Sequence, residues 1–187
     1  MTPVALTIAG SDPSGGAGLQ ADLKTFHQFG VYGEAVATLI TVQNTRGVTR
    51  VDTLAPDLVL AQLSAVLDDI PPGAAKTGAL GSRGVVEAVA DAAARFSFPL
   101  VVDPVMISKH GARLLDAASS QALVKRLIPR AYLLTPNLEE AEAMVGFSVD
   151  TPDAMRRAAR TLAGMGDRKS TRLNSSHIQK SRMPSSA

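Results

Sequence analysis

Short apolar runs alternate with segments of helical periodicity along residues 1–166, and this alternation constrains the fold more than any other feature. The run at 4–9 is typical of a buried strand, and residues 19–29 then carry apolar side chains at helical spacing. The same patterns predict strands at 35–42, 74–77, 100–103 and 131–135, and helices at 56–70, 83–96, 116–127, 138–145 and 152–165. Repeated strand–helix units predict an α/β fold, with a mainly parallel sheet covered by helices on both faces.

The composition changes at Asp167, where the strand–helix alternation stops. The segment 167–187 is polar, rich in serine and arginine, and without helical or strand periodicity, which is typical of a disordered terminus. A common sequencing adapter read in frame can encode most of it, so we interpret the segment as translated adapter. The fold is therefore predicted from residues 1–166 alone, as one domain.

The charge of the chain gives no sign of a nucleic-acid or membrane partner. The net charge of +2 comes from segment 167–187, which holds five of the 19 basic residues and one of the 17 acidic ones. No apolar stretch reaches the roughly 18 residues that span a bilayer, and the first residues lack the basic start of a signal peptide. The chain has no cysteine, which excludes disulfides and thiolate metal sites and favours a cytoplasmic location.

Polar residues stand where several of the predicted strands end. They are Asp12, Gln43, Lys76, Asp103 and Asn137. Ligands of parallel α/β sheets bind outside the carboxyl ends of the strands, so these side chains are the candidates for a binding site. Lys76 is given no role, because a single lysine at a strand end is usually a solvated rim residue.

A glycine-rich turn, residues 10–18, follows the first predicted strand. Glycines let the backbone approach a ligand closely, and the start of the next helix offers free N–H groups. The turn is not a Walker loop, since no Lys-Ser/Thr pair follows its glycines, and it lacks the GxGxxG pattern of dinucleotide-binding oxidoreductases. A tight strand–helix turn without a ligand is the alternative.

Five strings resemble one family in the same order along the chain. They are AGSDPSGGAGLQADLKTF (9–26), VQNTRGV (42–48), KTGALGS (76–82), VVDPVMISKHG (101–111) and LLTPNLEEAEAM (133–144). The chain resembles the hydroxymethylpyrimidine/phosphomethylpyrimidine kinases of thiamin biosynthesis. The resemblance implies a ribokinase-like fold, with residues 1–166 as the N-terminal part of the kinase domain. It also implies a homodimer that uses ATP and Mg²⁺ to phosphorylate 4-amino-5-hydroxymethyl-2-methylpyrimidine and then its monophosphate.

The resemblance assigns five residues to the pyrimidine substrate. They are Gly10, Asp12, Gln43, Ala79 and Val105. Asp12 would lie near the hydroxymethyl arm or else act as a helix N-cap, and Gln43 would bond the aminopyrimidine edge or else be a surface residue at a strand end. Ala79 stands where many relatives have methionine, which leaves a roomier pocket and bears on substrate preference. Val105 would line the pocket or belong to the core.

Three further residues are assigned to phosphate and metal by the same resemblance. Asp103 would lie near Mg²⁺ and the phosphates, or else cap the turn at Pro104. Asn137 and Glu140 match the Asn-x-x-Glu pattern of ribokinase-like kinases and would organise Mg²⁺ and phosphate through water. Asp103 and Glu140 are thus the predicted metal ligands. An N-cap followed by a first-turn glutamate is the alternative for Asn137 and Glu140.

The family's catalytic loop, which looks like Gly-Thr-Gly-Cys, is not found in this sequence. We therefore expect the chain to be incomplete at its C-terminus, to contain no catalytic residue of its own, and to be inactive and poorly stable. Two other functions stay open beside the pyrimidine kinase. One is a pyridoxal-type vitamin kinase, against which Gln43 and the intact GSDPSGGAG string argue, and the other is a non-catalytic pyrimidine-binding module.

Overall fold

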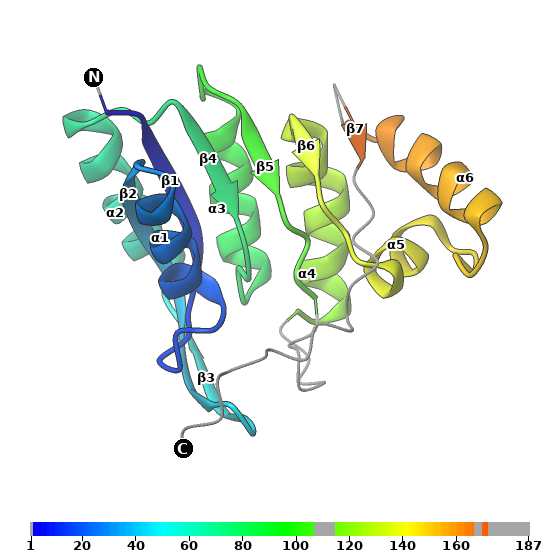
Figure 1. The fold of residues 1–187 in the computed structure, drawn as a ribbon, viewed down its shortest axis with the longest axis horizontal. Coiled ribbons are helices and arrows are strands. Elements are labelled where there is room, and N and C mark those ends of the chain that lie inside the picture. The colour runs from blue at the N-terminus through cyan, green and yellow to red at the C-terminus, as the bar shows by residue number, and fades with distance from the viewer. Residues whose placement is uncertain (1, 107–114, 167–169, 172–187) are drawn as a thin grey trace.

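A seven-stranded sheet forms the centre of the computed structural model, which describes residues 2–106, 115–166 and 170–171 (Figure 1). The strand order is β3-β2-β1-β4-β5-β6-β7, and every neighbouring pair is parallel except β2 with β3. The strands are β1 (Val4–Ser11), β2 (Tyr32–Asn44), β3 (Gly47–Thr53), β4 (Ala74–Thr77), β5 (Leu100–Val102), β6 (Leu133–Leu134) and β7 (Ser170–Thr171). The predicted mainly parallel α/β sheet is confirmed.

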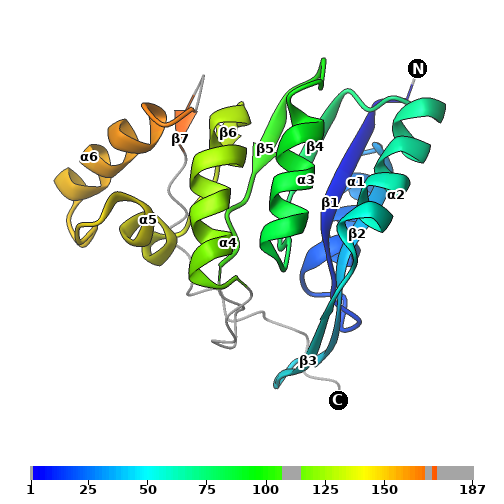
Figure 2. The same ribbon diagram turned by 180° about the vertical axis from the view of Figure 1, so that it is seen from behind.

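Helices cover both faces of this sheet, as predicted. They are α1 (Gly18–Gln28), α2 (Pro56–Asp69), α3 (Arg83–Ala93), α4 (Ala117–Ala122), α5 (Leu138–Val145) and α6 (Pro152–Ala163). Helix α1 lies on one face, and α2, α3 and α4 lie on the other (Figures 1 and 2). A π-helical segment at Leu123–Leu127 and a 3₁₀ turn at Ile128–Arg130 continue α4.

The chain changes direction across the sheet between β1 and β4, which are neighbours. From β1 it crosses over α1 to β2 on one side, and from β4 it crosses over α3 to β5 on the other side. Two crossovers that diverge from adjacent parallel strands leave a crevice at the carboxyl ends of those strands. The carboxyl ends of β1 and β4 are therefore the place where the fold itself predicts a ligand.

The core between the sheet and the second layer of helices is aliphatic, as the lack of tryptophan requires. Helix α3 shows why these residues form this layer. The Ser82 hydroxyl caps its first turn by accepting a bond from the Val85 N–H at 3.3 Å, and Val85, Val86 and Val89 are fully buried. Burying an aliphatic side chain of this size stabilises the fold by roughly 1.5–3 kcal/mol.

Strand β3 was not predicted from the sequence. It forms an antiparallel hairpin with β2 whose turn is held by Asn44, since the Asn44 Oδ1 accepts bonds from the N–H groups of Arg46 (2.9 Å) and Gly47 (3.2 Å). Most of β3 is exposed and carries charged side chains, so the apolar alternation that marks a half-buried strand is missing.

Two residues of the segment expected to be disordered, Ser170 and Thr171, form β7 beside β6 instead. Their backbone pairs with Leu133 and Leu134. Backbone pairing at an open sheet edge depends little on sequence, which is why composition did not indicate it. Residues 167–169 and 172–187 lie outside the described part of the chain. Within the described part, no helix combines the length and apolar character needed to cross a membrane.

Candidate functional site

The loop after β1 is organised by Asp12, which is almost fully buried. One oxygen of its carboxylate, Oδ1, accepts bonds from the Ser14 N–H at 2.8 Å and the Ser14 hydroxyl at 2.6 Å, and Oδ2 accepts one from the Gly16 N–H at 3.1 Å. The N-cap of α1 is Ala17, so Asp12 is not the cap that one sequence interpretation offered. Its carboxylate instead holds the glycine-rich loop closed, and a contact with substrate stays a prediction.

Gly18 brings the start of α1 against the end of β1. Its φ of +57° is in the left-handed region, and a Cβ there would lie 2.2 Å from the carbonyl oxygen of Gly10. Gln20 then fastens helix to strand, because its Oε1 accepts from the Asp12 N–H and its Nε2 donates to the Ser11 hydroxyl, both at 2.8 Å. The glycines thus serve this close approach, and Gly10, predicted to contact substrate, lies at its centre.

Two threonines on strand β2 hold the backbone at the end of β1 and just after β4 by hydrogen bonds. The Thr41 hydroxyl donates to the Ser11 carbonyl at 2.9 Å, and the Thr38 hydroxyl donates to the Ala79 carbonyl at 2.6 Å. Both threonines are buried, whereas Ala79 is partly exposed. The structure therefore fixes the backbone of Ala79, a predicted substrate contact, in the loop that follows β4.

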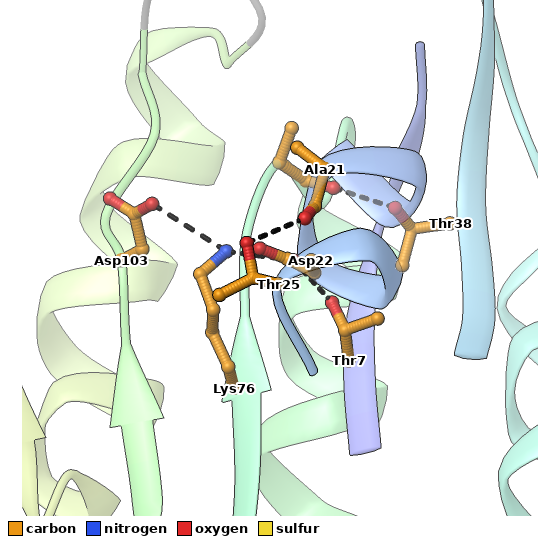
Figure 3. A network of polar contacts seen from close by, with 8 residues as sticks. Thr7, Ala21, Asp22, Thr25, Thr38, Lys76 and Asp103 are labelled. Carbon is orange, nitrogen blue, oxygen red and sulfur yellow. Dashed lines mark hydrogen bonds and ion pairs between the residues drawn. The ribbon is translucent and has the colours of Figure 1, made fainter. Parts of the chain in front are cut away.

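An ion-pair network lies across the carboxyl ends of the central strands (Figure 3). The ammonium of Lys76, on β4, lies 3.0 Å from Asp22 Oδ2 on α1 and 3.7 Å from Asp103 Oδ2 just after β5. The Thr7 hydroxyl on β1 also donates to Asp22 Oδ2, at 2.6 Å. Each of the three charged side chains keeps part of its surface exposed: 27% for Lys76, 17% for Asp22 and 32% for Asp103.

Asp103 is held in place by the backbone around it. Its N–H donates to the Thr77 carbonyl at 3.1 Å, which extends the pairing of β5 with β4, and its carbonyl accepts from the Val105 N–H at 2.9 Å in a tight turn. Burial and the nearby Asp22 raise the pKa of the Asp103 carboxyl, while Lys76 opposes the rise. Val105 is partly exposed beside this turn, so its assignment to the pocket stays a prediction.

Asn137 and Glu140 form a capping box at the start of α5. The Asn137 Oδ1 accepts from the Glu140 N–H at 2.8 Å, and the Glu140 carboxylate accepts from the Asn137 N–H at 2.9 Å. Glu140 is only 6% exposed, and burial together with the negative charge of Asp103 raises its pKa to about 7, although hydrogen bonds from the Asn137 and Met106 N–H groups oppose the rise. The capping alternative is thus confirmed as a structural role.

The carboxylates of Asp103 and Glu140, the two predicted metal ligands, are hard oxygen donors of the kind that suits a hydrated divalent cation. The negative charge of Asp103 raises the pKa of the Glu140 carboxyl, and a cation close to both carboxylates would favour the ionised form of Glu140. Among the described residues, no three acidic or histidine side chains gather into a metal cluster. Proteins usually bind Mg²⁺ with one or two carboxylates, and water and substrate phosphates complete the coordination. The oxygen chemistry of the predicted ligands suits this ion.

Gln43 lies near the tip of the β2–β3 hairpin, where a bulge interrupts the pairing between Val42 and Gln43. It is partly exposed, and no side-chain hydrogen bond to Gln43 is found within residues 2–106 and 115–166. Its amide is therefore available to a ligand, but the structure does not bring it into the ion-pair network. Its role in binding the pyrimidine stays a prediction.

Sequence reasoning missed Asp22 at this edge and gave Lys76 no role. A signal for Asp22 was present, because it lies three residues after Leu19 and four before Phe26, on the helix face that carries the apolar residues. An acid on the face that packs against a sheet needs a partner. The sequence around Lys76 gave no such signal. Lys76 lies between Asp22 and Asp103 only because β4 pairs with β1 on one side and with β5 on the other.

Comparisons with known proteins agree on one family. The family model for phosphomethylpyrimidine kinase matches residues 12–182. A hydroxymethylpyrimidine/phosphomethylpyrimidine kinase of Synechococcus elongatus is 49% identical over 164 residues, which make up 88% of this chain and 62% of that relative. The chain therefore spans less than two thirds of the length of this relative.

Solved structures extend the likeness to the fold. A crystal structure of phosphomethylpyrimidine kinase from Clostridium difficile has a TM-score of 0.88 at 43% identity, covering 95% of this chain and 77% of that one. A pyridoxal kinase from Staphylococcus aureus, in complex with AMP-PCP and pyridoxal, has a TM-score of 0.79 at 34% identity, covering 89% of this chain and 60% of that one. The predicted ribokinase-like α/β architecture is confirmed by these neighbours.

Proposed function

Because the chain belongs to the phosphomethylpyrimidine kinase family, we propose that the protein transfers a phosphoryl group from ATP to 4-amino-5-hydroxymethyl-2-methylpyrimidine and to its monophosphate. The observation that carries the proposal is the set of polar groups at the carboxyl ends of β1, β4 and β5. Carboxylates from α1 and β5 there share one lysine next to a glycine-rich loop. This is the crevice in which parallel α/β sheets bind their ligands.

The pyrimidine half of the site is formed by residues around the ends of β1, β2 and β4. Asp22 offers a carboxylate oxygen to a donor on the substrate, and Gln43 can both donate to and accept from the aminopyrimidine edge. Gly10 and Ala79 bring backbone close to the ring, and the small side chain of Ala79 leaves room above it. Asp12 supports this half by holding the loop closed.

The phosphate half of the site is formed by Asp103, Asn137 and Glu140. Their oxygens would hold Mg²⁺ directly or through water, and Mg²⁺ would neutralise charge on the phosphates of ATP. Lys76 keeps the Asp103 carboxylate oriented toward this half. The family resemblance implies that a catalytic base and an anion hole complete the reaction, and none of the residues named above takes those roles.

The direct test is a calorimetric titration of the 187-residue chain with hydroxymethylpyrimidine, with pyridoxal as competitor. We expect the pyrimidine to bind and pyridoxal to displace it only weakly. Gln43→Leu should weaken pyrimidine binding about tenfold, the equivalent of one hydrogen bond to a polar group, while the exposed Gln121→Leu should leave it unchanged. Equal affinity of the variant and the original chain would remove Gln43 from the site.

Pyridoxal phosphorylation is the second candidate function, favoured by the likeness to the Staphylococcus aureus pyridoxal kinase. If the chain binds pyridoxal more tightly than the pyrimidine, pyridoxal kinase becomes the favoured function and pyrimidine kinase the second candidate. Pyrimidine binding by the whole protein with no ATP-dependent turnover would favour the non-catalytic binding module.

A homodimer and a cytoplasmic location belong to the same proposal, the first because the family resemblance implies it and the second because the absence of cysteine favours it. Several large apolar side chains at the edge of the molecule are exposed, among them Ile40 and Val42 on β2, and a second copy could cover them. Sedimentation velocity would test the dimer, and a mass close to 19.4 kDa at micromolar concentration would contradict it.

A further inference from the structure

Lys76 is shared between two carboxylates that arrive from opposite sides of the crevice. Asp22 comes from α1, which covers one face of the sheet, and Asp103 comes from the end of β5, next to β4. The ammonium lies 3.0 Å from Asp22 and 3.7 Å from Asp103, so one positive charge serves two negative ones (Figure 3). The group carries a net charge of −1, and each of its three charged side chains is partly exposed to solvent.

The contacts with Asp22 use only one of its oxygens. Thr7 and Lys76 both donate to Oδ2, and among the described residues no donor contacts Oδ1. A carboxylate held by two donors at one oxygen has a fixed orientation, and its second oxygen is free to accept from a ligand. Removing the lysine would leave only the threonine to orient the carboxylate, next to a second negative charge that nothing offsets.

Stability alone does not account for this arrangement. The three charged side chains are partly exposed, so water screens their attraction and the pairing contributes only modestly to folding. A ligand that covers the crevice would exclude water from the three side chains and strengthen their attraction, because the effective dielectric constant falls. The pairing would therefore have its greatest effect when the site is occupied.

We propose that Lys76 is a positioning residue for substrate binding, which holds Asp22 in the orientation that accepts a bond from the pyrimidine while it also anchors Asp103 in the phosphate half. This inference rests on the proposed function for the identity of the ligand. Lys76 acts through the two carboxylates and does not itself contact the reacting atoms. Arginine, which can also reach two carboxylates, should replace it in part.

The test is a double-mutant cycle in the affinity of the 187-residue chain for hydroxymethylpyrimidine, measured by calorimetry. We expect Lys76→Met to weaken binding about tenfold and Asp22→Asn to weaken it at least as much. The double variant should bind no worse than Asp22→Asn, because the lysine acts through that carboxylate. Lys76→Arg should recover most of the loss, and Lys125→Met, the same change at an exposed site, should bind as the original chain does.

Losses that add in the double variant, or an unchanged affinity of Lys76→Met, would overturn the inference. The melting temperatures of the original chain, Lys76→Met, Asp22→Asn and the double variant give a reading that needs no ligand. Non-additive losses in melting temperature would show that Lys76 holds Asp22, and additive losses would overturn that pairing. If the original chain binds no pyrimidine, the proposed function fails, while the melting temperatures still decide whether the two residues act together.

Discussion

The carboxylates at the carboxyl edge of the sheet differ in how much of their hydrogen-bonding capacity the protein itself uses. Both oxygens of Asp12 accept bonds from its own loop, and Glu140 accepts backbone bonds at the start of α5. Asp22 accepts from Thr7 and Lys76 at a single oxygen, and Asp103 pairs with Lys76. Among the described residues no donor contacts Asp22 Oδ1, so that oxygen has capacity left for a ligand.

Residue types and spacing predicted part of this edge. Asp103 and Asn137 could be proposed from their positions after strands and Glu140 from the family resemblance, and the structure places Glu140 within electrostatic reach of Asp103. The pairing of Lys76 with Asp22 could not be predicted, because the two residues are 54 positions apart and meet only through the strand order. Contacts set by topology leave no local pattern in the sequence.

Glu140 should make the stability of the protein fall as the pH rises. Its pKa is 4.5 in a model peptide and about 7 in the fold, so between these values the folded state keeps a proton that the unfolded state has released. The free energy of unfolding should then decrease by up to about 3 kcal/mol between pH 4.5 and 7, and level off above that range. Urea denaturation in EDTA at pH 5 and pH 8 measures the decrease.

Glu140→Gln should flatten this pH dependence, because the amide does not titrate. The difference between the two proteins isolates the contribution of Glu140 to the pH dependence. The raised pKa of Asp103 acts in the same direction and is present in both proteins. Parallel pH profiles for the variant and the original chain would show that Glu140 ionises normally in the fold.

Gly18→Ala should destabilise the fold more than Gly146→Ala. Both glycines have a positive φ, but a Cβ at Gly18 would collide with the Gly10 carbonyl at 2.2 Å, whereas nothing lies within 4 Å of one at Gly146. Backbone strain alone costs about 1 kcal/mol, so we expect that loss at Gly146 and at least twice as much at Gly18. Thermal denaturation checks the order, and equal losses would mean that the loop moves freely.

At the scale of elements, the apolar periods predicted every helix and most strands, and the bounds of β4 and α5 agree with the predicted ranges. The failures have a common physical cause. Strand β3 is exposed and polar, and the π-helical segment at Leu123–Leu127 continues an apolar pattern that predicted a plain helix. The period of apolar residues indicates which side chains are buried. It therefore gives no sign of an exposed strand such as β3, and it does not distinguish a π-helical from an α-helical hydrogen-bond pattern when the same side chains are buried.

The part of β2 that β3 does not reach is covered by a side chain. Gln62 on α2 accepts from the Ala37 N–H and donates to the Ala37 carbonyl, both at 3.1 Å, so its amide bonds this edge as a neighbouring strand would. Leu54 continues the cover, since its N–H donates to the Thr38 carbonyl at 2.9 Å. An edge closed in this way exposes fewer free backbone groups to another chain.

Gln62→Ala should therefore destabilise the fold by about 1 kcal/mol, because two backbone groups of Ala37 lose their partner. Gln121→Ala, at an exposed position of α4, is the matched control and should change stability very little. The measurement is the midpoint of urea denaturation for the two variants. Similar midpoints would show that water replaces the Gln62 amide at no cost.

At the scale of the whole molecule, the order of the strands decides where the site lies. Crossovers diverge from β1 and β4, helices cover both faces, and the loops after β1, β4 and β5 all leave the same edge of the sheet (Figures 1 and 2). The sequence predicted the layers and this edge, because both follow from strand–helix alternation. The position of each strand within the sheet came from the structure.

A nuclear magnetic resonance titration of the ¹⁵N-labelled chain with hydroxymethylpyrimidine would show directly whether the pyrimidine binds, and to which part of the fold. We expect amide shifts to concentrate at the carboxyl ends of β1, β2 and β4, in the glycine-rich loop, and around Asp22 on α1 and Lys76 at the end of β4. Shifts that concentrate on α5 and α6, or an unchanged spectrum at millimolar ligand, would rule out a pyrimidine site at this edge of the sheet.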